Sequence, residues 1–205
     1  MPPVVRPAEP TDAEVPRLLY LSAAPYYDAY AGSERRALKV LQAIWGRPGH
    51  TAAAEQTLVA ELDGMLAGAM VAFPSADGDR LARRFLALSI VRLPVWRWPA
   101  IARHLRASAG VTPTPPRGAL YVDALATAEP VRRRGVATAL LDAASARARA
   151  EGLTGVALDT GLQNVEAQAL YERYGFEPGD IHRAPDERTA RAVGGAGFVS
   201  YFLAV

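Results

Sequence analysis

The chain has 205 residues, of which half are hydrophobic and 21% are charged, the balance of an ordinary globular protein. Its formal net charge of +2 argues against a nucleic-acid partner, because phosphate-binding proteins gather many uncompensated cations on one face. The absence of cysteine excludes disulfides, thiolate metal sites and a cysteine nucleophile, and His50, His104 and His182 stand too far apart for metal-ligand spacing.

The first third of the chain begins with patterns for a short strand and two helices. Residues 4–6 suit an edge strand, and Thr11 with Asp12 suits the cap of the helix that follows. A tyrosine-rich connector, residues 20–30, then leads to a second helix, for which Ser33 is the expected cap.

Two apolar runs, residues 57–62 and 65–73, flank Asp63 and Gly64, a pair that strongly favours a tight hairpin turn. The segment that follows, residues 74–118, is longer than a connection between two strands requires. Its pattern is mostly helical and ends in a proline-rich loop. We therefore expect a helical insertion before the fourth strand.

The rest of the chain alternates between strand and helix patterns. This order indicates an α/β sheet with helices packed on it. No repeat, low-complexity tract or linker interrupts residues 1–205, so we expect a single domain. The expected elements are a strand at 120–127, a helix at 135–151, a strand at 156–160, a helix at 164–174 and a strand at 198–205.

The junction between the strand at 120–127 and the next helix carries the sequence LATAEPVRRRGVA, residues 125–137. The free N–H groups and the dipole of a helix N-terminus attract anions, and small residues there let a phosphate approach the backbone. The three consecutive arginines add positive charge at the same place. The alternative is a solvated arginine cluster with no ligand. A strand before the motif and a helix after it favour a phosphate-binding loop.

A second pattern, NVEAQALYERYGF at residues 164–176, begins the following helix. Asn164 suits the cap of that helix, and Gly175 suits a left-handed residue that ends it. Tyr171 has two interpretations, because a helical tyrosine can pack in a core or take part in chemistry.

Together the two patterns resemble the motifs of the GNAT superfamily of acetyltransferases. Arg132-x-x-Gly135-x-Ala137 is similar to the signature Q/R-x-x-G-x-G/A, with Ala137 in place of the commoner glycine. Residues 164–176 look like the second motif, N-x-x-A-x-x-L-Y-x-x-x-G-F, and the resemblance is strong over residues 120–176.

The resemblance implies an α/β fold with a mixed, mainly antiparallel central sheet flanked by helices. It implies that this sheet is splayed open between the strands that begin at Leu120 and Gly155. It also implies that the helical insertion, residues 74–118, covers the side on which the acceptor binds.

The resemblance further implies acetyl-CoA as the co-substrate, without a metal. The amides of residues 133–138 would hold the pyrophosphate, and the main chain of Leu125 and Thr127 would pair with the pantetheine arm. Asn164 would contact the cofactor, and Tyr171 would protonate the departing thiolate. The implied cofactor-binding residues are Leu125, Ala126, Thr127, Arg132, Arg133, Arg134, Gly135, Val136, Ala137, Thr138 and Asn164.

On the acceptor side, strand alternation places Asp123 and Tyr121 on the same face as Leu125. Asp123 is the only carboxylate of that strand, and members of the family often place there a base that deprotonates the acceptor. Asp123 is thus a base, a substrate anchor or a structural residue. The candidate substrate-binding residues are Tyr26, Tyr27, Tyr30 and Tyr121.

Two function hypotheses follow. The first is direct acetyl transfer in a ternary complex to a primary amine, in a small molecule or a peptide, and the lack of cysteine excludes an acetyl-cysteine intermediate. The second is a non-catalytic acyl-CoA sensor or regulatory module, which needs neither Tyr171 nor Asp123 beside the thioester. A different nucleotide-binding α/β protein would need a parallel sheet and a glycine-rich first loop, and the patterns indicate neither.

No apolar run in the sequence is long enough to span a bilayer, and the first residues lack the apolar core of a secretion signal. We therefore expect a cytoplasmic protein with no membrane or nucleic-acid partner. The sequence leaves open the oligomeric state, a homodimer included, and the identity of the acceptor.

Overall fold

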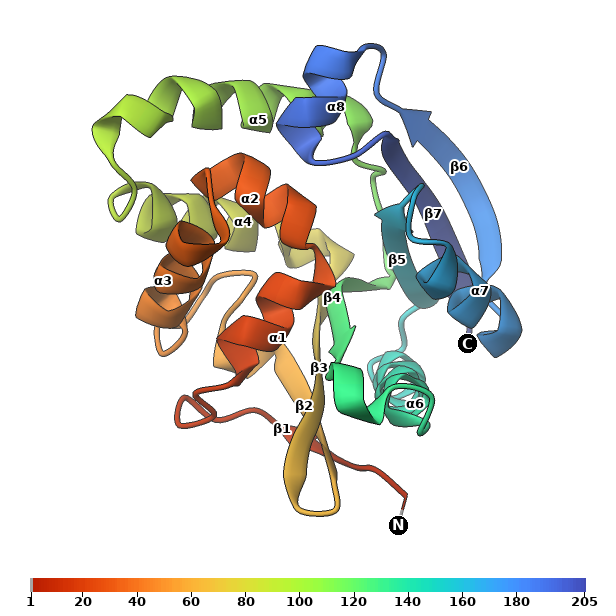
Figure 1. The fold of residues 1–205 in the computed structure, drawn as a ribbon. Helices are drawn as coiled ribbons and strands as arrows, with labels where there is room; N and C mark the ends of the chain where they lie inside the picture. The colour runs from red at the N-terminus through yellow and green to blue at the C-terminus, as the bar shows by residue number, and fades with distance from the viewer. Residues whose placement is uncertain (1) are drawn as a thin grey trace.

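The structure, a computed structural model, describes residues 2–205. Within this range seven strands form one sheet: β1 (Val4–Pro7), β2 (Thr57–Leu62), β3 (Met65–Pro74), β4 (Leu120–Thr127), β5 (Gly155–Gly161), β6 (Glu177–Arg183) and β7 (Gly197–Ala204). Their order across the sheet is β1-β2-β3-β4-β5-β7-β6 (Figure 1). Neighbouring strands pair antiparallel except β4 and β5, which are parallel. The predicted mixed, mainly antiparallel α/β sheet is therefore confirmed.

Eight α-helices flank the sheet in the described chain: α1 (Val15–Ser22), α2 (Ala24–Ala31), α3 (Glu34–Ile44), α4 (Gly78–Ile90), α5 (Trp98–Val111), α6 (Val136–Ala150), α7 (Val165–Tyr174) and α8 (Glu187–Val193). Helices α1 to α5 lie on one side of the sheet, while α6 covers the other (Figure 1). Alternating residues of β3 serve the two cores, with Val71 and Phe73 in the first and Met70 and Ala72 in the second. The sheet is thus buried on both faces at β3.

Both predictions for the region between β2 and β4 are confirmed. Asp63 and Gly64 join β2 to β3 with φ angles of 54° and 78°, the positive values that a tight hairpin turn requires. The helical insertion is present as α4 and α5, between β3 and β4.

The N-terminal region differs from the prediction in two respects. Asp12 does not cap α1, because its carboxylate accepts hydrogen bonds from the Arg6 guanidinium at 2.8 and 2.9 Å. The tyrosine-rich connector is mostly helical, since only Ala23 separates α1 from α2 and Pro25 occupies the first turn of α2, where proline is well tolerated.

The segment after α7 carries two elements that the sequence pattern did not predict, β6 and α8. Nearly every residue of β6 is exposed, so the strand lacks the apolar alternation that identifies strands in a sequence. Helix α8 has only seven residues and begins where the Asp186 carboxylate accepts a hydrogen bond from the Thr189 N–H. No helix in residues 2–205 combines the length and the apolar character needed to cross a membrane.

Strands β4 and β5 separate soon after they begin to pair. Only residues 120–122 of β4 are in register with residues 156–158 of β5. On the other edge of β4, the register with β3 shifts between Val71 and Ala72, which makes Asp123 the extra residue of a β-bulge. The opening between β4 and β5, with Asp123 at its margin, is where the candidate site lies.

Candidate active site

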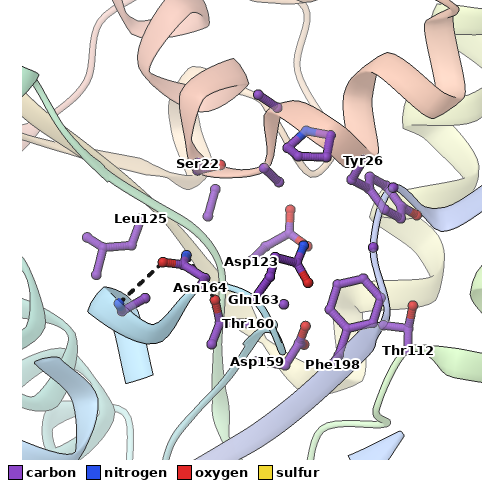
Figure 2. A pocket seen from close by; sticks show the side chains of 18 of the residues that line it. Ser22, Tyr26, Thr112, Asp123, Leu125, Asp159, Thr160, Gln163, Asn164 and Phe198 are labelled. Atoms are coloured by element: carbon purple, nitrogen blue, oxygen red, sulfur yellow. Dashed lines mark hydrogen bonds between the residues drawn. The ribbon is translucent and has the colours of Figure 1, made fainter. Parts of the chain in front are cut away.

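A cavity of about 480 Å³ occupies the opening between β4 and β5 (Figure 2). Segments far apart in the chain line it: the junction of α1 and α2, the end of α5, β4, β5, the start of α7 and the loop between α8 and β7. Figure 2 shows Asp123 and Asp159 in the middle of this space, with Leu125 and Asn164 toward one end and Tyr26 toward the other.

The loop between β4 and α6 has the geometry of an anion site. Arg133 and Gly135 adopt left-handed backbone conformations, with φ angles of 63° and 82°, and Gly135 is the N-cap of α6 without a capping side chain. Ala139 is the first residue of this turn whose N–H is hydrogen-bonded within the helix, and it donates to the Gly135 carbonyl at 2.9 Å. The earlier N–H groups, of residues 136–138, therefore remain available to a ligand.

The three arginines of this loop differ in their contacts. Arg134 donates to the Asp63 carboxylate at 3.0 Å and so connects the loop to the β2–β3 hairpin. Arg132 and Arg133 are exposed and form no ion pair within residues 2–205. Gly135 leaves open space, since an added side chain would meet nothing within 4 Å. Of the three predicted cations, Arg132 and Arg133 are thus the ones whose side chains remain available.

The predicted residues of β4 lie where this strand no longer pairs with β5. Leu125 lines the cavity, Ala126 is buried in the core on the α1 side, and Thr127 is half-buried at the end of the strand. The backbone edge that β5 leaves unpaired can accept an extended ligand as an added strand.

Asn164 and Tyr171 reach the cavity from α7. Asn164 caps this helix, as expected, by accepting a hydrogen bond from the Ala167 N–H at 3.3 Å. Tyr171 is only 6% exposed, and its ring packs against Phe176 and Tyr201 with centroids 5.9 and 5.6 Å away. Tyr171 thus packs in the core and also lines the cavity. Burial raises the pKa of its hydroxyl, which therefore keeps its proton at neutral pH.

Two carboxylates face the same cavity, Asp123 from β4 and Asp159 from β5. Although the Asp123 side chain is open to the cavity, the surrounding protein displaces most of the bulk water, and this desolvation, with the nearby charge of Asp159, raises the pKa of Asp123 to about 7. Desolvation also raises the pKa of Asp159 to about 6, although a hydrogen bond from the Tyr121 hydroxyl, at 2.5 Å, partly opposes the increase.

The sequence analysis did not identify Asp159. The available signal was a charged residue within an otherwise apolar strand, residues 156–160, since an unpaired carboxylate in such a strand needs an explanation. Within residues 2–205, no group of three His, Cys, Asp or Glu side chains is arranged to hold a metal ion.

The four candidate substrate-binding tyrosines fall into two pairs. Tyr26 and Tyr121 line the cavity. Tyr27 and Tyr30 do not line it, so the structure does not support a direct contact between these two and an acceptor in the cavity. Tyr30 is 5% exposed, and its hydroxyl forms a hydrogen bond with that of Ser89 at 2.6 Å, while Tyr27 packs against the same core.

The loop between α8 and β7 closes the cavity and was also absent from the prediction. Gly194 has a φ angle of 77°, and a side chain there would overlap the carbonyl oxygen of Pro25 at the start of α2. Phe198 lines the cavity from the start of β7, with its ring centroid 6.5 Å from that of Tyr26. This side of the site depends on contacts between the two ends of the chain.

The chain resembles acetyltransferases in sequence and in fold. Residues 16–176 match the model of the family described as "Acetyltransferase (GNAT) family". Acetyltransferase Atu2258 of Agrobacterium fabrum is 45% identical over 60 residues, which are 29% of this chain and 42% of that protein. The structure of an N-acetyltransferase from Staphylococcus aureus matches 98% of this chain and 100% of its own, with a TM-score of 0.71 and 16% identity. A GNAT family acetyltransferase from Elizabethkingia anophelis, solved with acetyl-CoA bound, matches 99% of this chain and 98% of its own, with a TM-score of 0.56 and 13% identity.

Proposed function

Because the chain belongs to the acetyltransferase (GNAT) family, we propose that it transfers an acetyl group from acetyl-CoA directly to a primary amine. One observation carries this proposal: Asp123 and Tyr171 line a single cavity beside the unpaired part of β4. The cavity thus contains a carboxylate that can accept a proton and a phenol that can donate one.

The junction of β4 and α6 suits the pyrophosphate of acetyl-CoA. The first turn of α6 offers N–H groups without a capping side chain, Gly135 leaves space in front of them, and Arg132 and Arg133 add positive charge. In this proposal the pantetheine arm lies along the unpaired edge of β4 at residues 125–127, and Asn164 contacts it from α7.

An acceptor that binds as an ammonium loses two protons when it becomes an amide, and the departing sulfur gains one. The acceptor nitrogen gives a proton to Asp123 and attacks the thioester carbonyl carbon, so that a C–N bond forms and the C–S bond breaks. Tyr171 gives its proton to the departing sulfur and is reprotonated, through solvent, by the second proton that the attacking nitrogen loses as the amide forms. Solvent then takes the first proton from Asp123. A pKa of about 7 suits Asp123 to this role, because a general base works best when its pKa lies near the working pH.

An acyl-CoA sensor without catalytic activity is the second candidate function. It would require the loop between β4 and α6, but no open cavity beside Tyr171. The cavity and its carboxylates favour the enzyme, because isolated acids facing a cavity are destabilising unless they serve a ligand.

Release of CoA in the presence of amines tests the proposal. With acetyl-CoA and a panel of primary amines and peptide N-termini, we expect CoA release above the rate without acceptor, and an acceptor heavier by one acetyl group in mass spectrometry. Binding of CoA by calorimetry, without turnover of any acceptor, would instead support the sensor.

A further inference from the structure

The cavity contains more negative charge than the proposed reaction uses. Acetyl transfer needs a single base, and Asp123 supplies it. The lining also includes Asp159, yet it includes no lysine, arginine or histidine within residues 2–205. A second carboxylate in the cavity makes the folded protein less stable and raises the pKa of Asp123, so its presence requires an explanation.

The contacts of Asp159 leave its charge uncompensated. The Tyr121 hydroxyl donates to one of its oxygens, but a phenol is neutral and cannot balance a charge. No cationic side chain of residues 2–205 lies within ion-pair distance of Asp159. The electrostatic influence of His182, on β6, lowers the pKa of Asp159, but by less than burial raises it. A cation from outside the chain would complete this site.

Other parts of the cavity also indicate a ligand with positive charge. The aromatic side chains of Tyr26, Tyr121 and Phe198 line the cavity together with the carboxylates, and ammonium groups bind favourably against such rings.

The positions along β4 suggest how such a ligand lies. Leu125, Asp123 and Tyr121 all line the cavity. The prediction that strand alternation places them on one face is wrong, because the β-bulge at Asp123 turns Leu125 toward the α6 core and Tyr121 toward the α1 core. The parallel register ends with Val122 and Leu158, so Asp123 and Asp159 come next along the two strands, and the Tyr121 hydroxyl donates to Asp159 there. One amino group can therefore reach Asp123 while a second group reaches Asp159.

We propose that Asp159, held in place by Tyr121, binds a second ammonium group of the acceptor, so that the preferred acceptor is a small amine with at least two amino groups. This inference rests on the acetyl transfer proposed above. A diammonium acceptor balances both carboxylates on binding. When the attacking nitrogen gives its proton to Asp123, the remaining ammonium still balances Asp159, and no unpaired charge is left in the cavity.

The test compares putrescine with aminobutanol, which has the same length but a hydroxyl group in place of one amine. We expect the wild-type kcat/KM for putrescine to exceed that for aminobutanol by about 10- to 100-fold, the range of a charge-assisted hydrogen bond. Asp159→Asn keeps the shape of the side chain and an oxygen that can accept from Tyr121. It should nevertheless reduce the ratio of the two kcat/KM values to within about threefold of unity.

A matched control uses another tyrosine–aspartate pair of the chain. The Tyr174 hydroxyl donates to Asp142 at 2.8 Å on α6, outside the cavity, so Asp142→Asn should leave the ratio as in wild type. A purely structural defect lowers both kcat/KM values together and does not change their ratio.

Three results would contradict the inference. They are equal kcat/KM values for both amines in wild type, an unchanged ratio of these values in Asp159→Asn, or a ratio that falls as far in Asp142→Asn as in Asp159→Asn. If no amine is acetylated, the proposed function fails separately. Calorimetry with protein saturated with CoA then decides the inference, since putrescine should still bind more tightly than aminobutanol, and only when Asp159 is present.

Discussion

The proposed phosphate loop and the proposed acceptor cavity share β4, but they are built in opposite ways. The loop at residues 128–135, with the first turn of α6, is one continuous segment, and its positive character comes from backbone N–H groups and exposed arginines. The cavity is assembled from segments between residues 21 and 198, is lined by two carboxylates and contains no basic side chain in the described chain. A cofactor site can thus be specified by one short segment, whereas the acceptor site depends on the whole fold.

The sharpest test of this division is Tyr171→Phe, on the cavity side. The phenylalanine keeps the ring contacts with Phe176 and Tyr201 but cannot protonate a thiolate. We expect kcat to fall by about 100-fold or more, within the range of general acid catalysis, while the Kd for CoA stays unchanged. Steady-state kinetics and calorimetry on the same preparation measure both. Equal turnover would show that water protonates the thiolate.

Gly135→Asp tests the opposite side, the phosphate loop. A carboxylate at the N-terminus of α6 would repel the pyrophosphate, so the Kd for CoA should rise by at least about tenfold. Gly135→Asn is the matched control, because asparagine has the same size and tolerates the left-handed backbone but carries no charge. The asparagine variant should lose less affinity than the aspartate variant, and similar losses in the two would mean that crowding rather than charge is responsible.

The pH dependence of acceptor kcat/KM tests the acidity of the cavity. Asp123 must be ionised to act as a base, so kcat/KM should increase through a pKa of about 7 and fall about tenfold per pH unit below it. The charged or titratable groups near Asp123 are Asp159, Tyr26, Tyr27 and Tyr121, and burial raises the pKa of each tyrosine, so these remain neutral.

Asp159→Asn should move this transition to lower pH, because it removes the like charge that raises the pKa of Asp123. Asp123→Asn should lower kcat/KM for the acceptor and remove the transition altogether, with the Kd for acetyl-CoA unchanged. A transition that persists in Asp123→Asn would assign the base to another group.

The smallest expected effect is on stability. Folding raises the pKa of Asp123 from 3.8 to about 7, so the folded chain is more stable when this carboxyl is protonated than when it is ionised. That stability is lost as the pH rises from 3.8 to about 7. Asp123→Asn should therefore raise the Tm at pH 8, by about 2 °C or more, with little change at pH 3.5. A lower Tm at pH 8 would mean that the ionised carboxylate has a stabilising partner.

The features that could be predicted from the sequence depend on residues close together in the chain. The hairpin turn requires only Asp63 and Gly64, the cap of α7 requires Asn164 and the amide three residues later, and the anion site lies within one junction. The order of strands and helices indicated only an α/β sheet. The resemblance to the family added the mixed, mainly antiparallel architecture and drew attention to Tyr171.

The remaining features depend on contacts between distant residues. Asp159 lines the cavity because β5 pairs in parallel with only a short part of β4. The hydroxyl of Tyr121, 38 residues earlier, also donates a hydrogen bond to it. Tyr30 is buried because Ser89 and His104 come from the insertion and pack against it. No local pattern records such pairings, so the same type of residue can be a core residue at position 30 and a cavity residue at position 26.

The tight contact of Gly194 with Pro25 has a consequence for the order in which the protein matures during synthesis. A nascent chain emerges from the ribosome with its N-terminus first, so β4, the phosphate loop and α6 are available to fold before Gly194 has been added. Contacts across such a sequence separation also form slowly, because the entropy lost on closing a long loop comes before the gain from the contact. The proposed anion site can therefore form in the growing chain, whereas the proposed acceptor cavity is complete only after translation has passed α8.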